Sequence, residues 1–264
     1  MLIFALGFTV VEIAMFERLD VFGVVLSFLG GVLIALPLAW MSSKTRLKRT
    51  SLSVVVWVVL FVVEFSDVVE GYFFTTLLSD PAVLGGSLLR SLLGTLVQGL
   101  MAGALFLPAT HSNTLFSELS GFLKGRGFAS WVWRIAVASA AYLPVYFFFG
   151  ALISPFVIPY YSDPSLGLRI PSFNVIIPLE LFRGLLYAAA LLPLFASVWA
   201  RRRTMLAIIA SVLYVPGALV PLMIQSTLPT SILPFHLVEI LADSLVYGTI
   251  ATYLLARNPR EIIQ

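Results

Sequence analysis

The sequence has no cysteine and very few charged residues. Of its 264 residues, none is cysteine and 11% are Asp, Glu, Lys or Arg. The absence of cysteine excludes disulfide bonds, thiolate metal sites and cysteine nucleophiles. Because soluble domains are roughly 25% charged, the scarcity of charge excludes an ordinary soluble fold.

Hydrophobic residues take the place of the missing charges. They make up 60% of the chain, and the mean hydropathy is +1.02. About twenty apolar residues in a helix cross a bilayer, and the sequence contains several runs of that length. We therefore expect an all-α fold, a polytopic transmembrane helix bundle, with residues 1–264 forming a single integral membrane domain.

Apolar runs bounded by turn residues predict eight helical segments. These cover residues 2–16, 21–41, 51–77, 88–108, 128–159, 172–199, 204–224 and 235–256. The first segment is short for a span, and it lacks the basic start and small-residue cleavage site of a signal peptide, so we expect a retained helix. The chain then has eight spans, or seven spans and one interfacial helix.

The distribution of lysine and arginine predicts the orientation in the membrane. The loops that follow the second, fourth, sixth and eighth segments are basic, whereas the alternate loops near 79–87, 160–171 and 225–233 hold only Arg169. Since basic loops stay inside, the C-terminus is expected in the cytoplasm, in the inner membrane of a prokaryotic cell. This topology also explains the pI of about 9.3 without nucleic-acid binding. One basic loop is expected to contact anionic lipid through Lys44, Arg46, Lys48 and Arg49.

Two features indicate how the helices pack and bend. Small residues recur at helical spacing, for example Gly99 and Gly103, and such faces allow close helix packing, within the bundle or between copies in an oligomer. Packing within the bundle is the preferred interpretation. Prolines such as Pro178 and Pro216 predict kinks. The loop 109–127 contains an amphipathic stretch that is expected to lie in the headgroup plane.

Nine ionisable residues lie inside the predicted spans. Each costs roughly 2.5–3.5 kcal/mol at a helix centre on insertion scales, so each needs a partner, water or a function. Helix rise and orientation place all of them in the outer half of the bilayer, which predicts one shared cavity for protons, cations or a substrate. They are Glu64, Asp67, Glu70, Arg90, Glu180, Arg183, His236, Glu239 and Asp243.

Acidic groups outnumber basic groups in this layer. Six carboxylates face two arginines and one histidine, so pairing both arginines leaves four acids without a permanent cation. Buried carboxylates in that situation either take up protons or hold a cation. The leading hypothesis is therefore a small proton- or cation-coupled transporter with an acidic cavity.

Two alternatives remain open from the sequence. His236, Glu239 and Asp243 have the i, i+3, i+7 spacing that places three ligands on one helix face, as in an intramembrane hydrolase with a divalent cation. A carboxylate–histidine site without metal is a variant of this interpretation, and no pattern requires a cofactor. The third hypothesis is a structural or partner-binding subunit whose interhelical salt bridges fix helix register.

Familiar catalytic motifs are absent. The sequence contains no G-x-S-G rhomboid serine, no GxGD aspartyl-protease motif and no Walker A motif. The segment ELFRG at 180–184 lacks the adjacent glutamates that CAAX-type intramembrane proteases place before their arginine. The residues therefore indicate a membrane class and a charged layer, without a family.

Overall fold

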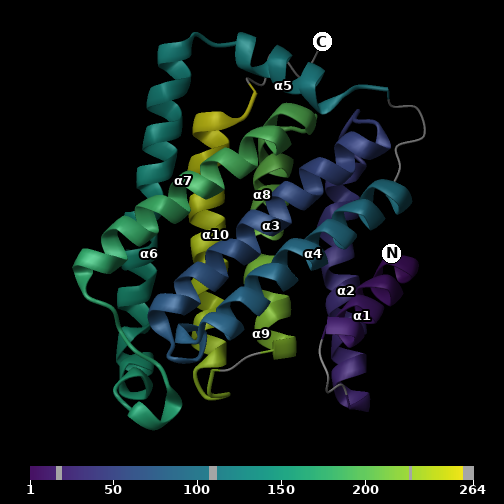
Figure 1. Ribbon diagram of the computed structural model, residues 1–264. Coiled ribbons are helices and arrows are strands. Elements are labelled where there is room, and N and C mark those ends of the chain that lie inside the picture. The colour runs from purple at the N-terminus through teal and green to yellow at the C-terminus, as the bar shows by residue number, and fades with distance from the viewer. Residues whose placement is uncertain (16–19, 107–111, 226–227, 258–264) are drawn as a thin grey trace.

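The computed structural model of the protein is a bundle of long helices (Figure 1). It describes residues 1–15, 20–106, 112–225 and 228–257. Within these ranges the chain forms α-helices, two short 3₁₀ turns and one π-helical turn, with no β-strand. The predicted all-α bundle of transmembrane type is confirmed.

The helices follow the predicted apolar runs closely. They are α1 (Leu2–Met15), α2 (Val21–Ser42), α3 (Arg49–Phe74), α4 (Pro81–Leu105), α5 (Leu115–Lys124), α6 (Phe128–Tyr161), α7 (Phe173–Ser197), α8 (Arg202–Tyr214), the π-helical turn Val215–Leu219, α9 (Val220–Gln225) and α10 (Leu233–Leu255). The 3₁₀ turns are η1 (Leu77–Ser79) and η2 (Pro164–Leu166).

Seven helical stretches in the described residues are long and apolar enough to cross a membrane. Six are single helices, and the seventh joins α8, the π-helical turn and most of α9. With 14 residues, α1 is shorter than these, about 21 Å long. Its Phe4 and Ala5 are fully buried against neighbouring helices, so α1 packs within the bundle against α2 and α4.

Helix α4 begins earlier than the hydropathy pattern predicts. Its first residue is Pro81, whereas the apolar run begins at residue 88. The Asp80 side chain caps the helix by accepting a hydrogen bond of 2.7 Å from the backbone N–H of Ala82. Asp at the N-cap and Pro at the first position are both favourable at a helix start. The hydropathy pattern missed this start because small residues follow it and lower the local hydropathy.

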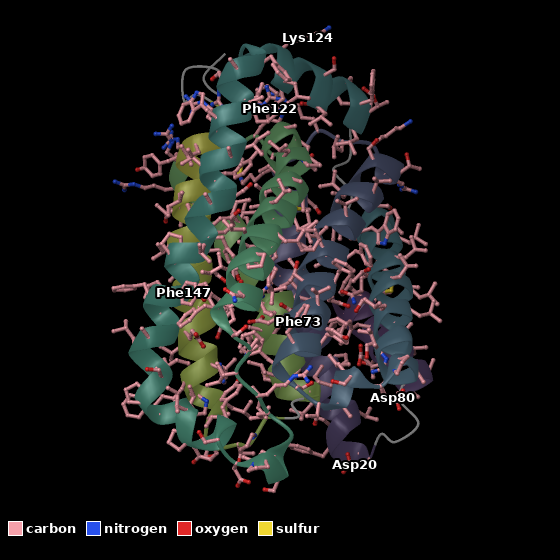
Figure 2. The ribbon with its side chains drawn as sticks, turned by 60° about the vertical axis from the view of Figure 1, so that its left-hand side comes forward. Asp20, Phe73, Asp80, Phe122, Lys124 and Phe147 are labelled. Atoms are coloured by element: carbon pink, nitrogen blue, oxygen red, sulfur yellow. The ribbon has the colours of Figure 1, made fainter. Side chains whose placement is uncertain are left out.

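The basic loops gather at one end of the bundle, which we call the basic end. Figure 2 shows Lys124 at this end and Asp20 and Asp80 at the opposite end. Hydrogen bonds between loops join the helices here. Arg126 donates to the carbonyl groups of Leu255 and Ala256, at the end of α10, over 3.2 and 2.6 Å. The alternation of basic loops therefore corresponds to a physical clustering of positive charge.

Helix α5 crosses the basic end of the bundle (Figure 1). Thr114 caps it, accepting a hydrogen bond of 3.1 Å from Ser117. The Phe122 side chain is buried against Trp131 of α6, while Phe116 is exposed. Helix α5 thus has one face on the bundle and one face outward, in agreement with the amphipathic pattern in the sequence.

The absence of cysteine makes the orientation directly testable. We expect Lys124→Cys, at the basic end, to react with a membrane-impermeant maleimide only after the cell membrane is permeabilised. Ser165→Cys, in η2 at the opposite end, should react in intact cells or spheroplasts. Labelling with the reverse pattern would show that the basic end faces outward.

Close packing of α3 on α4 depends on two glycines of α4. A Cβ atom on Gly103 would lie 2.6 Å from the backbone oxygen of Arg49 and would also meet the side chain of Ser53. A Cβ atom on Gly99 would lie 2.7 Å from the backbone oxygen of Ser53. These glycines therefore pack within the bundle, as the preferred interpretation of the small-residue pattern expects.

A pair of glycine substitutions on α4 tests this contact. We expect Gly103→Ala to lower the free energy of unfolding by about 1–3 kcal/mol, because the new methyl group meets backbone that cannot move freely. Gly86→Ala is the control, since no atom lies within 4 Å of its Cβ position. It should leave stability unchanged or raise it by up to about 1 kcal/mol through helix propensity. Equal denaturation midpoints of the two variants in detergent would contradict the packing.

Candidate functional site: a charged network around Arg183

Arg183 of α7 is the centre of a network of charged groups. Its guanidinium lies 2.9 Å from a carboxylate oxygen of Glu180, one turn earlier on α7. It also lies 2.8 Å from Glu70 and 3.6 Å from Asp67, both on α3. One positive charge therefore joins three carboxylates from two helices. We call these four residues the Arg183 network.

The network runs from the bundle interior toward its surface. The side chains of Glu180 and Arg183 are 0% and 4% exposed, whereas those of Glu70 and Asp67 are 27% and 34% exposed. Burial of an ion pair is tolerated only when the partners are close and further hydrogen bonds satisfy them. Glu180 and Arg183 form such an inner pair, and Glu70 and Asp67 connect the pair to the surroundings.

Aromatic rings enclose the guanidinium on its buried side. Its centre lies 5.5 Å from the ring of Tyr142 and 5.9 Å from the ring of Tyr187, within the range of cation–π attraction. The Tyr187 hydroxyl also accepts a hydrogen bond of 3.4 Å from Arg183. The ring of Tyr142 makes edge contacts with Tyr187 and with Tyr247 of α10. Four helices, α3, α6, α7 and α10, thus contribute to the surroundings of one arginine.

Some buried atoms of the network have no hydrogen-bond partner within the described ranges. These are Oε1 of Glu180 and Nε of Arg183. Buried polar atoms are nearly always paired, and exceptions need an explanation. The arrangement therefore does not stabilise these charges fully. The two unpaired atoms can still form a hydrogen bond to a proton-bearing group, a water molecule or a ligand.

A histidine pair lies close to the start of α10. Nδ1 of His236 is 2.9 Å from a carboxylate oxygen of Glu239, one turn later. Asp243 is 6% exposed, and its Oδ1 has no hydrogen-bond partner among described residues. In the part of the chain that the structure describes, no three His, Asp or Glu side chains are grouped so that they could hold a metal ion. The three residues lie on one helix, and a metal site built from them stays a prediction.

Glu64 and Arg90 belong to a different place. They line a pocket of about 190 Å³ between α1, α3, α4 and α9. Asp67 lines this pocket as well and also contacts Arg183, so it belongs to both groups. The nine charged residues therefore do not surround one shared cavity, because α3 carries charges toward two different sets of neighbours.

Uncharged polar residues also belong to the Arg183 network and to the Glu64 pocket. The sequence analysis missed them because it considered only ionisable residues. Tyr142 on α6 faces Arg183, and Gln98 on α4 lines the pocket with Glu64. A glutamine inside an apolar run is itself unusual and could have been found. A tyrosine in a span gives no such indication, because aromatic residues are common in membrane helices.

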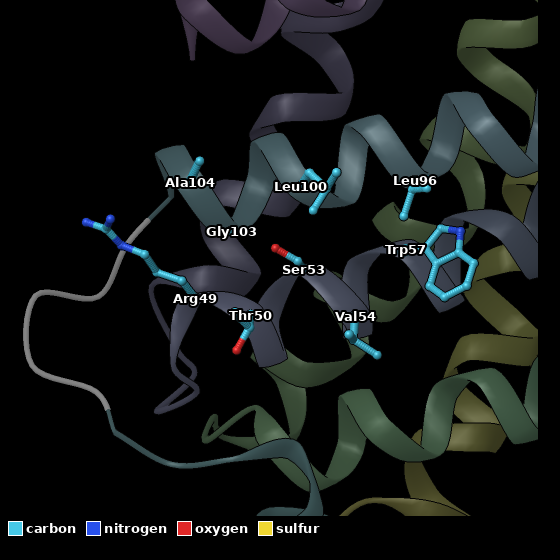
Figure 3. Close-up of a pocket in the computed structure, with 9 residues that line it drawn as sticks. All are labelled: Arg49, Thr50, Ser53, Val54, Trp57, Leu96, Leu100, Gly103 and Ala104. Carbon is cyan, nitrogen blue, oxygen red and sulfur yellow. The ribbon is translucent and has the colours of Figure 1, made fainter.

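A second groove opens between α3 and α4 near the basic end. It has a volume of about 370 Å³, and Figure 3 shows Arg49, Ser53, Trp57 and Leu100 among its lining residues. Arg46 lies over the ring of Trp199, with 4.6 Å from its guanidinium carbon to the ring centre. Contact of these basic residues with anionic lipid stays a prediction, while the apolar helix surfaces imply contact with a lipid bilayer.

Comparisons with protein-family models, with curated proteins and with solved structures found no match for this chain. Any functional assignment therefore depends on the residues described above and on their geometry.

The inner ion pair predicts a pattern of stability changes. We expect Arg183→Met to lower the free energy of unfolding by about 3–5 kcal/mol, because Glu180 would then be a buried charge without a partner. The double variant Arg183→Met with Glu180→Gln should recover most of that loss. Chemical denaturation in detergent micelles, arranged as a double-mutant cycle, measures the coupling. Additive losses would show that the two side chains do not stabilise each other.

Proposed function

We propose that this membrane protein is a small proton-coupled carrier with the Arg183 network as its proton-binding site. The observation that carries the proposal is the ratio of charges around Arg183. Three carboxylates lie within 4 Å of one guanidinium, and two of them are more than a quarter exposed. Ionisable residues inside spans commonly form proton relays or substrate pathways. A surplus of acid beside a fixed cation suits such a relay.

Protonation would change the contacts of Arg183 in a defined way. A proton on Glu70 neutralises the carboxylate that lies 2.8 Å from Arg183 and weakens that ion pair. The guanidinium keeps its pair with Glu180, so it stays in place while the contact between α7 and α3 loosens. Loss of the proton restores the contact. The network thus offers two states whose balance depends on one proton, which is what a coupled carrier requires.

The helices around the network contain prolines and a π-helical turn, which favour a conformational change. Pro178 lies inside α7 two residues before Glu180, and Pro193 lies inside it near the basic end. The π-helical turn Val215–Leu219 lies against α3, with the Cβ position of Gly217 at 3.8 Å from a carboxylate oxygen of Asp67. Proline kinks and π-helical turns in membrane helices are frequent at sites that move or bind.

Reconstituted protein provides the test. In liposomes that contain a pH-sensitive dye, we expect the wild-type protein to raise proton flux above that of protein-free liposomes when a pH or cation gradient is applied. Glu70→Gln should lower this flux at least tenfold, because an amide cannot take up and release the proton. Asp67→Asn should also lower the proton flux.

The control is Asp163→Asn, in the loop opposite the basic end. Hydrogen bonds from the side chain and backbone of Ser165 hold the pKa of Asp163 below its usual value, so the substitution removes a full negative charge outside the network. Its flux should equal the wild-type flux. Unchanged flux in both Glu70→Gln and Asp67→Asn, or no wild-type flux under either gradient, would contradict the carrier proposal.

The structural alternative has one specific observation in its favour. The pair of Arg183 and Glu180 is buried, and it links α7 to α3 through Glu70, as a register-fixing salt bridge would. Under that alternative Glu70→Gln changes stability, and no gradient-driven flux exists to be lost. The intramembrane-hydrolase alternative has less geometric support, since within the described residues His236 pairs with a single carboxylate, that of Glu239.

A further inference from the structure

The pocket that holds Glu64 adjoins the Arg183 network at Asp67 and has two kinds of wall. Its apolar lining comes mainly from α1, α2 and α9, with Phe8, Ile34 and Ile224 among the lining residues, and Glu12 of α1 adds a carboxyl group. Its polar side comes from α3 and α4, with Glu64 and Gln98. The lining residues of α4 extend from Ser87 to Gln98, about three helical turns. A long pocket with an apolar side and a polar side suits an amphipathic ligand.

One buried oxygen in this pocket has no donor. Side-chain hydrogen bonds from Ser91 and Gln98 reach the carboxylate of Glu64. A carboxylate only accepts, so the amide nitrogen of Gln98 must be the group that faces Glu64. This leaves Oε1 of Gln98, on a side chain that is 3% exposed, with no hydrogen-bond partner in the described residues. A buried acceptor of this kind is destabilising unless a bound group supplies the donor.

The charges and the volume define the missing group. Glu12, Glu64 and Asp67 bring three carboxyl groups to the lining and Arg90 brings one guanidinium, so a cation is favoured over an anion. Glu12 and Arg90 each have interaction partners of their own. A volume of about 190 Å³ is many times the roughly 10–15 Å³ that one water molecule needs, so the pocket has room for a ligand of several heavy atoms. That is too large for one bare metal ion and fits a short organic cation.

We propose that this pocket binds a small alkylammonium, the cation of a primary amine. The ammonium group contacts both the Glu64 carboxylate and Oε1 of Gln98, and the alkyl chain lies against Phe8 and Ile224. An ammonium carries three N–H donors, so it supplies the donor that Gln98 lacks while it neutralises Glu64. Binding here does not require that the Arg183 network carries protons.

Calorimetric titration of the purified full-length protein in detergent tests the proposal. The probe is n-pentylammonium, which has six heavy atoms, and the matched probes are n-pentanol, pentanoate and sodium ion. We expect pentylammonium to bind at least tenfold more tightly than each of the other three. Pentanol binding as tightly would reduce the site to an apolar cavity. Tighter binding of sodium would make it an inorganic cation site, and absence of pentylammonium binding would also overturn the proposal.

Variants locate the binding within the protein. Glu64→Gln and Gln98→Met should each weaken pentylammonium binding at least tenfold, and Asp163→Asn should leave it unchanged. Thermal unfolding midpoints measured without the probe show which variants are folded. If Glu64→Gln does not fold, Gln98→Met, which keeps the side-chain length, serves as the test variant. Wild-type affinity in a folded Gln98→Met variant would place the ammonium elsewhere and contradict the assignment.

Discussion

The burial of Arg183 beside Glu180 is the constraint on which the arrangement of the bundle depends. Both side chains are almost fully inaccessible, in a chain whose surroundings offer little to solvate charge. Such a pair survives only with close geometry and additional polar contacts. Glu70 approaches from α3, and tyrosines approach from α6 and α7. The absence of a side chain at Gly184 lets the α6 backbone near Ser139 come close, because a Cβ atom there would collide with it.

This constraint explains why the acids of α3 divide between two groups. A single arginine can contact only the carboxylates within reach of its guanidinium, and α3 presents Glu70 and Asp67 to it but not Glu64. Glu64 instead receives neutral donors from α4, Ser91 and Gln98. Glu64 and Glu70, six residues apart on α3, therefore have different chemistry. Glu70 pairs with a fixed cation, whereas Glu64 is held by uncharged hydrogen-bond donors.

Much of the fold could be predicted from the sequence, because apolar length and loop charge act locally. The spans and the clustering of the basic loops follow from these rules, and so does the amphipathic α5. The start of α4 was missed because small residues hid a helix that Asp80 and Pro81 begin. The site was harder. A spacing of three residues places Glu180 and Arg183 on the same side of a helix. Which acids meet Arg183 depends on how α3 and α7 cross, and Tyr142 and Gln98 carry no charge that would single them out.

Asp67 connects the Arg183 network with the Glu64 pocket, because it belongs to both. One of its oxygens lies 3.6 Å from Arg183, and the residue also lines the Glu64 pocket, beside the π-helical turn of the span 202–224. A charge at this position acts on both sides of α3, since electrostatic interactions in an apolar medium are weakly screened. Neutralising Asp67 weakens the hold of Arg183 on α3 and at the same time lowers the negative charge of the pocket. Any change in one group is therefore felt in the other through this residue, without a separate chain of contacts between them.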